Sequence, residues 1–257
     1  MKIASWNVNS LNVRLPQLQQ WLQEAAPDVV GLQETKLEDH RFPDTALLEA
    51  GYRSVFHGQK TYNGVAILAR ERAIEDVQTG IPGFADAQAR AIAATVGGVR
   101  IVNLYVVNGQ DVGTEKYAYK LRWLEAARGW IADELQRHPT LVVLGDFNIA
   151  PDDRDVHDPA TWNDGHILTS TAERDALRRL LALGLHDGFR LHCEEGGVFS
   201  WWDYRQAAFR RNLGLRIDLT LVSEALRGAT VEAGIDRTPR TWERPSDHAP
   251  AFVTLAR

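Results

Sequence analysis

Residues 141–148 read LVVLGDFN, and this stretch decides how the chain is expected to fold. Four apolar residues followed by a glycine are typical of a short buried strand that ends abruptly. Asp146 and Asn148 would then lie at the rim of a sheet and share one face, because alternate residues of a strand point the same way. A carboxylate beside a carboxamide suits a hard divalent cation, a reacting water or a phosphate oxygen. The competing interpretation is an ordinary turn, since Gly, Asp and Asn dominate turns.

The composition is that of an ordinary globular protein without a disulfide framework. The chain has 257 residues, of which 44% are hydrophobic and 25% are charged, which is enough for one large layered domain. Its formal net charge of -5 provides no overall basic field, so a polyanion must meet a local patch or a metal. The single cysteine, Cys193, excludes an internal disulfide and a Cys-rich zinc site. Because the sequence shows neither a signal segment nor a membrane-spanning apolar run, we expect a cytoplasmic protein.

A strand, a helix and a second strand are predicted near the N-terminus. Residues 2–8 and 28–32 have strand-like patterns, and residues 15–25 carry an apolar stripe at helical spacing with a proline in the first turn. In such a unit, sites form just beyond the strand ends. Asn7 and Glu34 occupy these positions, which makes Glu34 a candidate metal ligand. An acidic residue at the start of a helix is the competing interpretation of Glu34.

Two antiparallel hairpins are predicted in the middle of the chain. Asn63-Gly64 and Gly97-Gly98 each stand between runs of strand-like residues, and such dipeptides are strong turn signals. The strand that follows the second turn ends near Tyr105. This tyrosine is either a packed aromatic residue or a polar group directed at the same rim as Asp146.

The second half of the chain repeats the order of strand, helix and strand. Helices are predicted at residues 114–137 and 172–183, on either side of the strand at 141–148. Residues 150–170 form a polar loop rich in Asp and His, which is either a second metal site or a solvated loop. The absence of helical ligand spacing favours the solvated loop, although a loop of this length is often functional.

Arginines alternate with large aromatic residues between residues 199 and 216. Arginine can hold a phosphate in a forked geometry, and tryptophan can stack on a base or wedge against a sugar, although at least one of the two adjacent tryptophans is expected to pack in the core. Asp218 is a single carboxylate in an apolar strand and therefore needs a partner. Since neighbouring side chains point in different directions, Asp218 is a better candidate than Asp247 to orient His248.

No repeat, low-complexity tract or linker divides the chain, so we expect one domain in which two similar halves each supply a mixed sheet. Six motifs then follow in order: WNVN at 6–9, GLQETK at 31–36, GDFNI at 145–149, FSWWDYR at 199–205, LRID at 215–218 and PSDHAP at 245–250. Together they resemble the motifs of the exonuclease III family of abasic-site endonucleases, in the endonuclease/exonuclease/phosphatase superfamily, and they cover nearly the whole chain. The resemblance implies an α/β fold for residues 1–257: a four-layered, DNase I-like α/β sandwich in which two mixed β-sheets pack face to face with helices on the outside.

The resemblance also implies a Mg²⁺-dependent enzyme, with Mn²⁺ as a substitute, that cuts DNA on the 5′ side of abasic sites in base excision repair. Family members often trim 3′ ends as well. The implied partner is therefore double-stranded DNA with abasic sites or blocked 3′ ends, bound by a monomer and away from membranes. The alternatives are an enzyme that mainly processes 3′ ends, another phosphoesterase of the superfamily, or a DNA-binding module without turnover. The net charge of -5 argues against the binding module.

Site residues carried over from the resemblance fall into three groups. The implied metal ligands are Asn7, Glu34, Asp146, Asn148 and Asp247. The implied catalytic residues are Tyr105, Asp146, Asn148, Asp218 and His248. The implied substrate-binding residues are Arg90, Asn108, Trp201, Arg205, Leu215, Arg216 and Ile217. In this assignment Glu34 is the principal metal ligand, Asp146 handles a proton, and Asn148 holds the water or the developing phosphorane charge. Trp201, Leu215 and Ile217 would form an apolar pocket for the base-free sugar. The chain departs from familiar members at residues 107–109 and 150–170, which leaves the balance between activities open.

Overall fold

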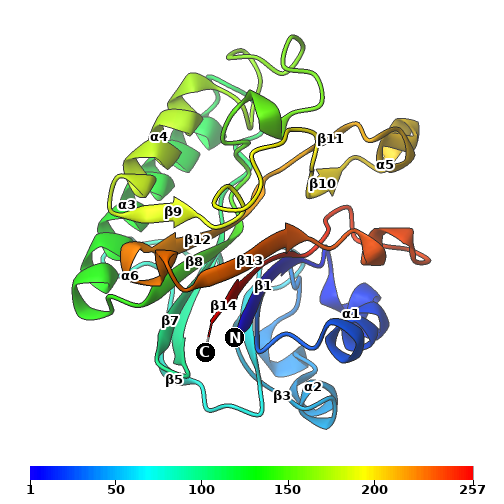
Figure 1. The fold of residues 1–257 in the computed structure, drawn as a ribbon, viewed down its shortest axis with the longest axis vertical. Coiled ribbons are helices and arrows are strands. Elements are labelled where there is room, and N and C mark those ends of the chain that lie inside the picture. Colours follow the sequence, from blue (N-terminus) through cyan, green and yellow to red (C-terminus); the bar gives the residue numbers. More distant parts are fainter. Residues whose placement is uncertain (257) are drawn as a thin grey trace.

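Two six-stranded β-sheets pack face to face in the computed structural model, which describes residues 1–256. Helices cover the outer face of each sheet, so the chain forms four layers in the order helix, sheet, sheet, helix (Figure 1). This architecture confirms the predicted four-layered α/β sandwich.

The first sheet takes strands from both ends of the chain. In spatial order it contains β13 (Thr230–Ile235), β14 (Ala251–Leu255), β1 (Lys2–Asn7), β2 (Val29–Gln33), β4 (Val65–Arg70) and β3 (Tyr52–His57). β1 and β2 are parallel and the other neighbours are antiparallel, so the sheet is mixed. The expectation that each half of the chain supplies one sheet therefore fails for β13 and β14, which return to lie beside β1.

The second sheet comes from the middle of the chain. In spatial order it contains β5 (Glu75–Thr79), β6 (Ala91–Val96), β7 (Val99–Tyr105), β8 (Leu141–Asp146), β12 (Asp218–Ser223) and β9 (Leu185–Asp187). β7 and β8 are parallel, and their register pairs Tyr105 with Asp146, while β12 pairs Asp218 with Asp146 from the other side. Three polar residues thus stand in a row at one end of this sheet. A separate ribbon joins β10 (Trp201–Trp202) to β11 (Gly214–Leu215).

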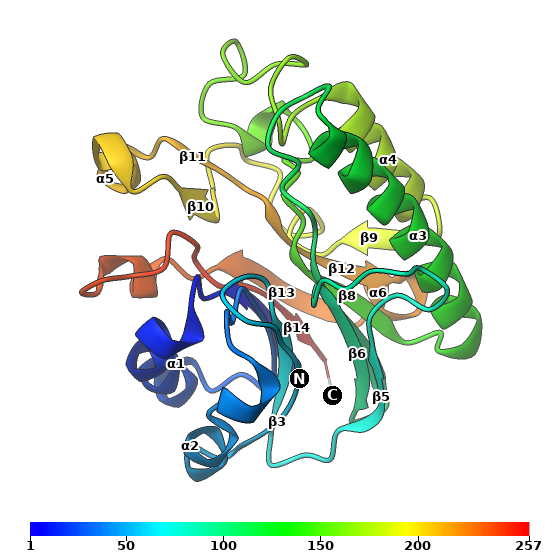
Figure 2. The same cartoon turned by 180° about the vertical axis from the view of Figure 1, so that it is seen from behind.

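Helices cover both outer faces (Figure 2). α1 (Leu11–Ala25) and α2 (Asp44–Glu49) lie over the first sheet, and α3 (Glu115–Arg137) and α4 (Thr171–Leu181) lie over the second. The connections contain the short helices α5 (Ala208–Arg211) and α6 (Glu224–Arg227) and the 3-10 turns Asp39–Arg41, Asp153–Asp155, Arg205–Ala207 and Thr238–Thr241. Ser170 and Glu173 form a capping box that fixes the start of α4. Among the helices of residues 1–256, none has the length and apolar character needed to cross a membrane.

Three apolar layers hold the sandwich together. The layer between the sheets includes Ile3, Val29, Ile101, Val142 and Leu144. The outer layers include Trp6, Trp21 and Leu22 under α1 and Trp123, Leu124 and Leu177 under α3 and α4. Because β8 is covered on both faces, it reads as a continuous apolar run, and its polar residues are confined to its end.

Candidate active site

Polar side chains from both sheets meet at one edge of the sandwich. Asn7 and Glu34 come from the ends of β1 and β2 in the first sheet, and Asp146 comes from the end of β8 in the second. His248 precedes β14 and reaches the same point. Ligand atoms of Glu34, Asp146 and His248 lie within 4.8 Å of one another, and we refer to these three residues as the Glu34 cluster. Residues that are far apart along the chain therefore share one site.

Asn7 joins the two carboxylates of the Glu34 cluster. Its Nδ2 donates to Glu34 Oε1 and to Asp146 Oδ2, each at 2.9 Å. The ammonium of Lys36 forms an ion pair with Glu34 at 2.9 Å, which offsets part of the negative charge. A neutral amide and one ammonium thus stabilise two nearby carboxylates in a partly buried crevice.

His248 lies between two carboxylates of the second sheet. Its Nδ1 is 2.8 Å from Asp218 Oδ2, and its Nε2 is 3.7 Å from Asp146 Oδ2. Burial lowers the pKa of His248, but the Asp218 and Asp146 carboxylates outweigh burial and raise this pKa to about 10. Burial, partly opposed by the His248 charge, raises the pKa of Asp146 to about 7. The imidazole is thus cationic at neutral pH, and Asp146 is poised to exchange a proton.

Ser200 holds Asp218 in place behind His248. Its Oγ donates to Asp218 Oδ2 at 2.7 Å and accepts the main-chain N–H groups of Ile217 and Asp218, each at 3.0 Å. Ser200 therefore fixes the carboxylate that contacts His248, and the main chain next to that carboxylate fixes Ser200. The structure places Asp218, and not Asp247, against the imidazole.

Asn148 is held at the end of β8 by three hydrogen bonds. Its N–H donates to Asp146 Oδ1 at 2.9 Å, and its Nδ2 donates to Val106 O at 3.0 Å. Its Oδ1 accepts from Asn108 Nδ2 at 3.1 Å. Asn148 also has a φ of +49°, in the left-handed region that asparagine tolerates better than most residues. Asn108 and Asn148 therefore form one rigid pair beside Asp146.

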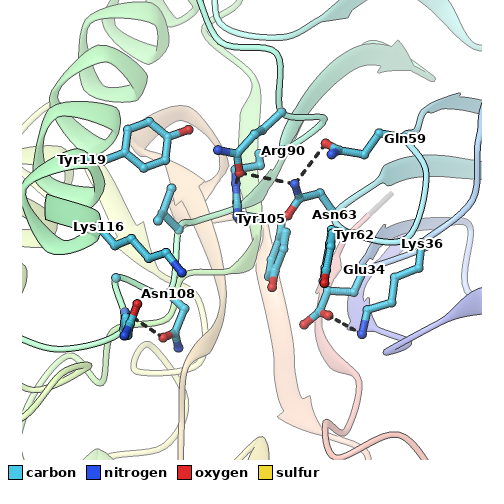
Figure 3. Close-up of a pocket in the computed structure, with 14 residues that line it drawn as sticks. Glu34, Lys36, Gln59, Tyr62, Asn63, Arg90, Tyr105, Asn108, Lys116 and Tyr119 are labelled. Atoms are coloured by element: carbon cyan, nitrogen blue, oxygen red, sulfur yellow. Dashed lines mark hydrogen bonds and ion pairs between the residues drawn. The ribbon is translucent and has the colours of Figure 1, made fainter. Parts of the chain in front are cut away.

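Tyr105 is both a packed aromatic residue and a polar group of the site, the two roles that the sequence left open. Its ring packs under the Arg90 guanidinium at 4.7 Å, while burial and the charges of Glu34 and Asp146 raise its pKa well above the ordinary value. The hydroxyl and the Glu34 carboxylate point in the same direction in Figure 3. Tyr105 thus keeps its proton and can serve as a donor in the site.

A cleft of about 450 Å³ opens beside the Glu34 cluster (Figure 3). Its walls include Arg90, Tyr105 and Asn108, and also Lys36, Tyr62, Lys116 and Tyr119, which the sequence analysis did not assign to the site. Three cations line this cleft in a chain whose net charge is -5, so it is the local basic patch that a polyanion would require. Lys116 was missed because it lies in the first turn of a helix, where a lysine resembles any solvated residue.

A packed apolar cluster lies at the β10–β11 ribbon, and we refer to it as the Leu215 cluster. Leu215 and Ile217 are buried in it, and the partly exposed Trp201 packs against them. The loop at 150–170 contributes Val156 and Leu168, which are also buried. Within residues 1–256 the loop contributes no acidic or histidine group to a metal-like cluster, and its apolar residues pack in the Leu215 cluster.

Arg205 and Arg216, two arginines of the aromatic and basic segment at 199–216, have different environments. Arg216 is fully buried, with Nε 2.6 Å from Asp155 and Nη2 2.7 Å from Asp187. Both sides of its guanidinium are engaged inside the protein, which differs from the expected substrate contact. Arg205 is exposed at the edge of a smaller cleft next to Trp201.

Asp247 lies next to the Glu34 cluster but is not among its ligand groups. Its Oδ1 accepts from Asn9 Nδ2 at 2.9 Å, and its Oδ2 accepts from Trp201 Nε1 at 3.0 Å. Both oxygens thus hold neighbouring side chains, and the assignment of Asp247 as a metal ligand stays a prediction. Asp247 fixes Trp201 at the edge of the smaller cleft.

The donor set of the Glu34 cluster fits a divalent metal ion. Glu34 and Asp146 offer two carboxylates, both of which accept from the amide of Asn7, whereas the cationic imidazole of His248 has no free lone pair to offer. Oxygen-rich sets of this kind suit Mg²⁺ or Mn²⁺ better than soft metals.

Comparisons with known proteins agree with this arrangement. A model described as the Endonuclease/Exonuclease/phosphatase family matches residues 4–248. The chain is 36% identical to Exodeoxyribonuclease III of Haemophilus influenzae, over 98% of this chain and 99% of that protein. It superposes with a TM-score of 0.98 on the 3′ phosphatase NExo from Neisseria bound to a product DNA hairpin, at 48% identity with both chains fully covered. It also superposes with a TM-score of 0.94 on an AP endonuclease from Archaeoglobus fulgidus, at 36% identity over 99% of each chain.

Proposed function

Because the chain belongs to the endonuclease/exonuclease/phosphatase family, we propose that it is a DNA repair enzyme that hydrolyses the phosphodiester bond on the 5′ side of an abasic site and also trims blocked 3′ ends. The convergence of Glu34, Asp146 and His248 from two sheets carries this proposal. Further support comes from the basic cleft, which opens beside the cluster, and from Trp201, which lines a second, smaller cleft.

Glu34 and Asp146 would hold a Mg²⁺ ion, with Asn7 keeping the two carboxylates at the required separation. When bound, such an ion supplies Lewis-acid stabilisation for charge on the phosphate and on the leaving 3′ oxygen. Asn7 adds no negative charge where an anionic substrate must approach. Asp247, whose oxygens accept from Asn9 and Trp201 next to the cluster, is a further candidate ligand.

Asp146 is the proposed acceptor of the proton from the attacking water. In the metal-free site, burial raises its pKa to about 7, and a general base works best when its pKa lies close to the operating pH. His248 is cationic and places positive charge where the phosphorane becomes negative, and Asp218 keeps the ring in that orientation. Tyr105 and the amides of Asn108 and Asn148 would supply neutral donors to the phosphate oxygens.

Selectivity for a damaged nucleotide would come from Trp201. A sugar without its base has lost stacking, so extruding it costs less than the few kcal/mol that a normal nucleotide requires. Trp201 is partly exposed and is backed by the buried Leu215 and Ile217, so it offers an aromatic face against which the base-free sugar would pack.

The similarity to the 3′ phosphatase NExo favours a second candidate, an enzyme that acts mainly on 3′ ends. Both candidates use the Glu34 cluster. They differ in the nucleotide that would be accepted beside Trp201. Assays of one preparation on an abasic duplex and on duplexes with recessed or 3′-phosphorylated ends separate them. Rapid nicking of the abasic duplex supports the first candidate, and activity confined to 3′ ends supports the second.

The metal-dependent chemistry is tested with EDTA and with Asp146→Asn. We expect each to lower the cleavage rate by at least about 1000-fold, because each removes a charge that acts on the transition state. The variant should retain the circular dichroism spectrum of the wild type, since Asn fits the same space. Equal cleavage in the presence of EDTA would reject the metal role.

A further inference from the structure

An ion pair lies fully buried directly behind the site. Lys120 of α3 and Glu173 of α4 are both completely shielded from solvent, and Lys120 Nζ donates to Glu173 Oε1. Burying two charges costs free energy that their attraction does not always recover, so a buried pair is weak evidence of a stabilising role. What the pair contacts provides a better guide to its purpose.

The Lys120 ammonium also binds two main-chain carbonyls of the site. Nζ donates to Asn148 O at 2.7 Å and to Asn108 O at 3.1 Å. These are the two residues whose side-chain amides form the pair beside Asp146. An ammonium has three donors and no acceptor, so one group satisfies both carbonyls and the Glu173 carboxylate at once.

The main chain of Asn148 needs such a contact. Its φ of +49° is costly for a residue other than glycine, and a strained conformation persists only where the surroundings hold it. The carbonyl bond to Lys120 and the N–H bond to Asp146 fix the peptide groups on both sides of the Asn148 α-carbon. The direction of the Asn148 amide is thereby set from inside the protein.

Glu173 extends the same network to the Leu215 cluster. Its Oε1 accepts from the N–H of Leu168 at 3.1 Å, and its Oε2 accepts from the N–H and the hydroxyl of Ser170 at 3.1 and 2.6 Å. Leu168 packs in the cluster with Leu215 and Ile217, against which Trp201 lies. The ion pair thus connects the site amides to the cluster that supports Trp201.

We propose that Lys120 is a positioning residue for the nuclease reaction, which acts by holding the main chain of Asn108 and Asn148 in register with Asp146 while Glu173 ties them to the Leu215 cluster. This inference rests on the proposed function, because it assigns those amides a role on the phosphate. Lys120 itself does not touch the substrate.

The test measures the single-turnover cleavage rate of an abasic duplex and the Kd for that duplex separately. We expect Lys120→Met to lower the rate about 10- to 100-fold, because small displacements of site groups have effects of that size, and to change Kd less than about threefold. The side-chain amide NMR signals of Asn108 and Asn148 should shift in the same variant. Unchanged signals and an unchanged rate would overturn the proposal.

Lys120→Met leaves Glu173 unpaired in the interior and can fail to fold, so Lys120→Met/Glu173→Gln provides a second test. Removing both charges should restore most of the lost stability, while the rate should stay low because the carbonyls still lack their donor. A rate that recovers together with the melting temperature would show that the pair only stabilises the fold.

Arg100→Met is the matched control. Arg100 is also buried and pairs with a helix glutamate, Glu134, but it lies at the opposite end of β7 from Tyr105. This variant should lose stability without losing cleavage rate. If the wild type cuts no DNA substrate, the proposed function fails, whereas the NMR signals still report whether Lys120 positions the two amides.

Discussion

Single residues show how burial determines chemistry in this site. His248 has a carboxylate opposite each ring nitrogen, so its positive charge is stabilised although the side chain is shielded from water. Asp146 shares this environment, and its pKa rises because burial penalises its charge. Asp218 has the largest effect of the three carboxylates that raise the pKa of His248, ahead of Asp146 and Asp247.

Asp218→Asn should therefore lower the pKa of His248. The folded pKa of about 10 lies above the ordinary value of 6.5, so the histidine contributes stability that is complete below pH 6.5 and is lost as the pH rises through 10. Without the Asp218 charge we expect the pKa to fall by about 1 to 3 pH units. NMR titration of the metal-free protein, with urea unfolding at several pH values, should show a lower pKa and a smaller loss of stability between pH 6.5 and 10. An unchanged titration would show that Asp218 does not stabilise the imidazolium.

The sequence predicted some of these residue-level relations and concealed others. A lone carboxylate in an apolar strand indicated that Asp218 needs a partner, and the structure supplies His248. Nothing in the helical pattern distinguished Lys120 from a solvated lysine, since its partner Glu173 is 53 positions away. Arg216 was assigned to substrate because it follows other arginines, but two distant aspartates bury it. Long-range charge pairing leaves no local signal.

At the level of elements, strands and helices with strong periodicity were predicted well. The two hairpins are confirmed, and so are the helices at 114–137 and 172–183, with small shifts at their ends. β5 and β13 were missed because they are edge strands whose residues are mostly exposed or partly exposed, so neither has the continuous apolar run of a buried strand. α1 begins four residues earlier than expected, at Leu11, where Ser10 has a φ of +84° and gives no capping signal.

The β10–β11 ribbon explains why two adjacent tryptophans have different environments. Neighbouring residues of a strand point to opposite faces, so Trp202 is buried against Phe209 while Trp201 lines the smaller cleft. We expect Trp201→Ala to reduce discrimination between abasic and intact duplexes about tenfold, with a smaller effect on binding, because one aromatic contact is worth about 1–3 kcal/mol. Cleavage rates and Kd values for the two duplexes give the comparison.

Trp202→Phe provides the control for Trp201→Ala, because it alters the other face of the same ribbon. The indole N–H of Trp202 donates to Asn212 in the wild type, and Phe cannot replace this hydrogen bond. The variant should therefore lose stability but still discriminate between abasic and intact duplexes. If Trp201→Ala leaves the discrimination between abasic and intact duplexes unchanged, Trp201 belongs to the structural core and other residues determine the selectivity.

At the level of the whole molecule, the site exists only where the two sheets meet. The first sheet and the segment before β14 carry Asn7, Glu34 and His248, and the second sheet carries Asp146 and Asp218. The sequence indicated two stacked sheets but not which strands neighbour each other, because the return of β13 and β14 to β1 is a long-range pairing. The distance between the sheets therefore controls the geometry of the Glu34 cluster.

Gly31 sets part of that distance. A Cβ at this position in β2 would lie 2.2 Å from Leu144 Cδ1 and 2.9 Å from Asn103 Cγ, and both side chains belong to the second sheet. Asn103 also links the sheets, since its Nδ2 donates to Leu32 O and Ala66 O, each at 2.9 Å. Gly31→Ala should therefore push the sheets apart and cost about 1–3 kcal/mol of unfolding free energy.

The same displacement should slow cleavage, although Gly31 touches no group of the Glu34 cluster. We expect a rate loss of about tenfold or more at temperatures where the variant is fully folded, because Glu34 and Asp146 would be held at a different separation. Gly129→Ala is the control: it faces open space on α3, so the variant should gain about 0.5–1 kcal/mol and keep its rate. Urea unfolding and single-turnover cleavage measure both effects. A Gly31→Ala variant with lowered stability and a wild-type rate would show that the cluster adjusts independently of the spacing between the sheets.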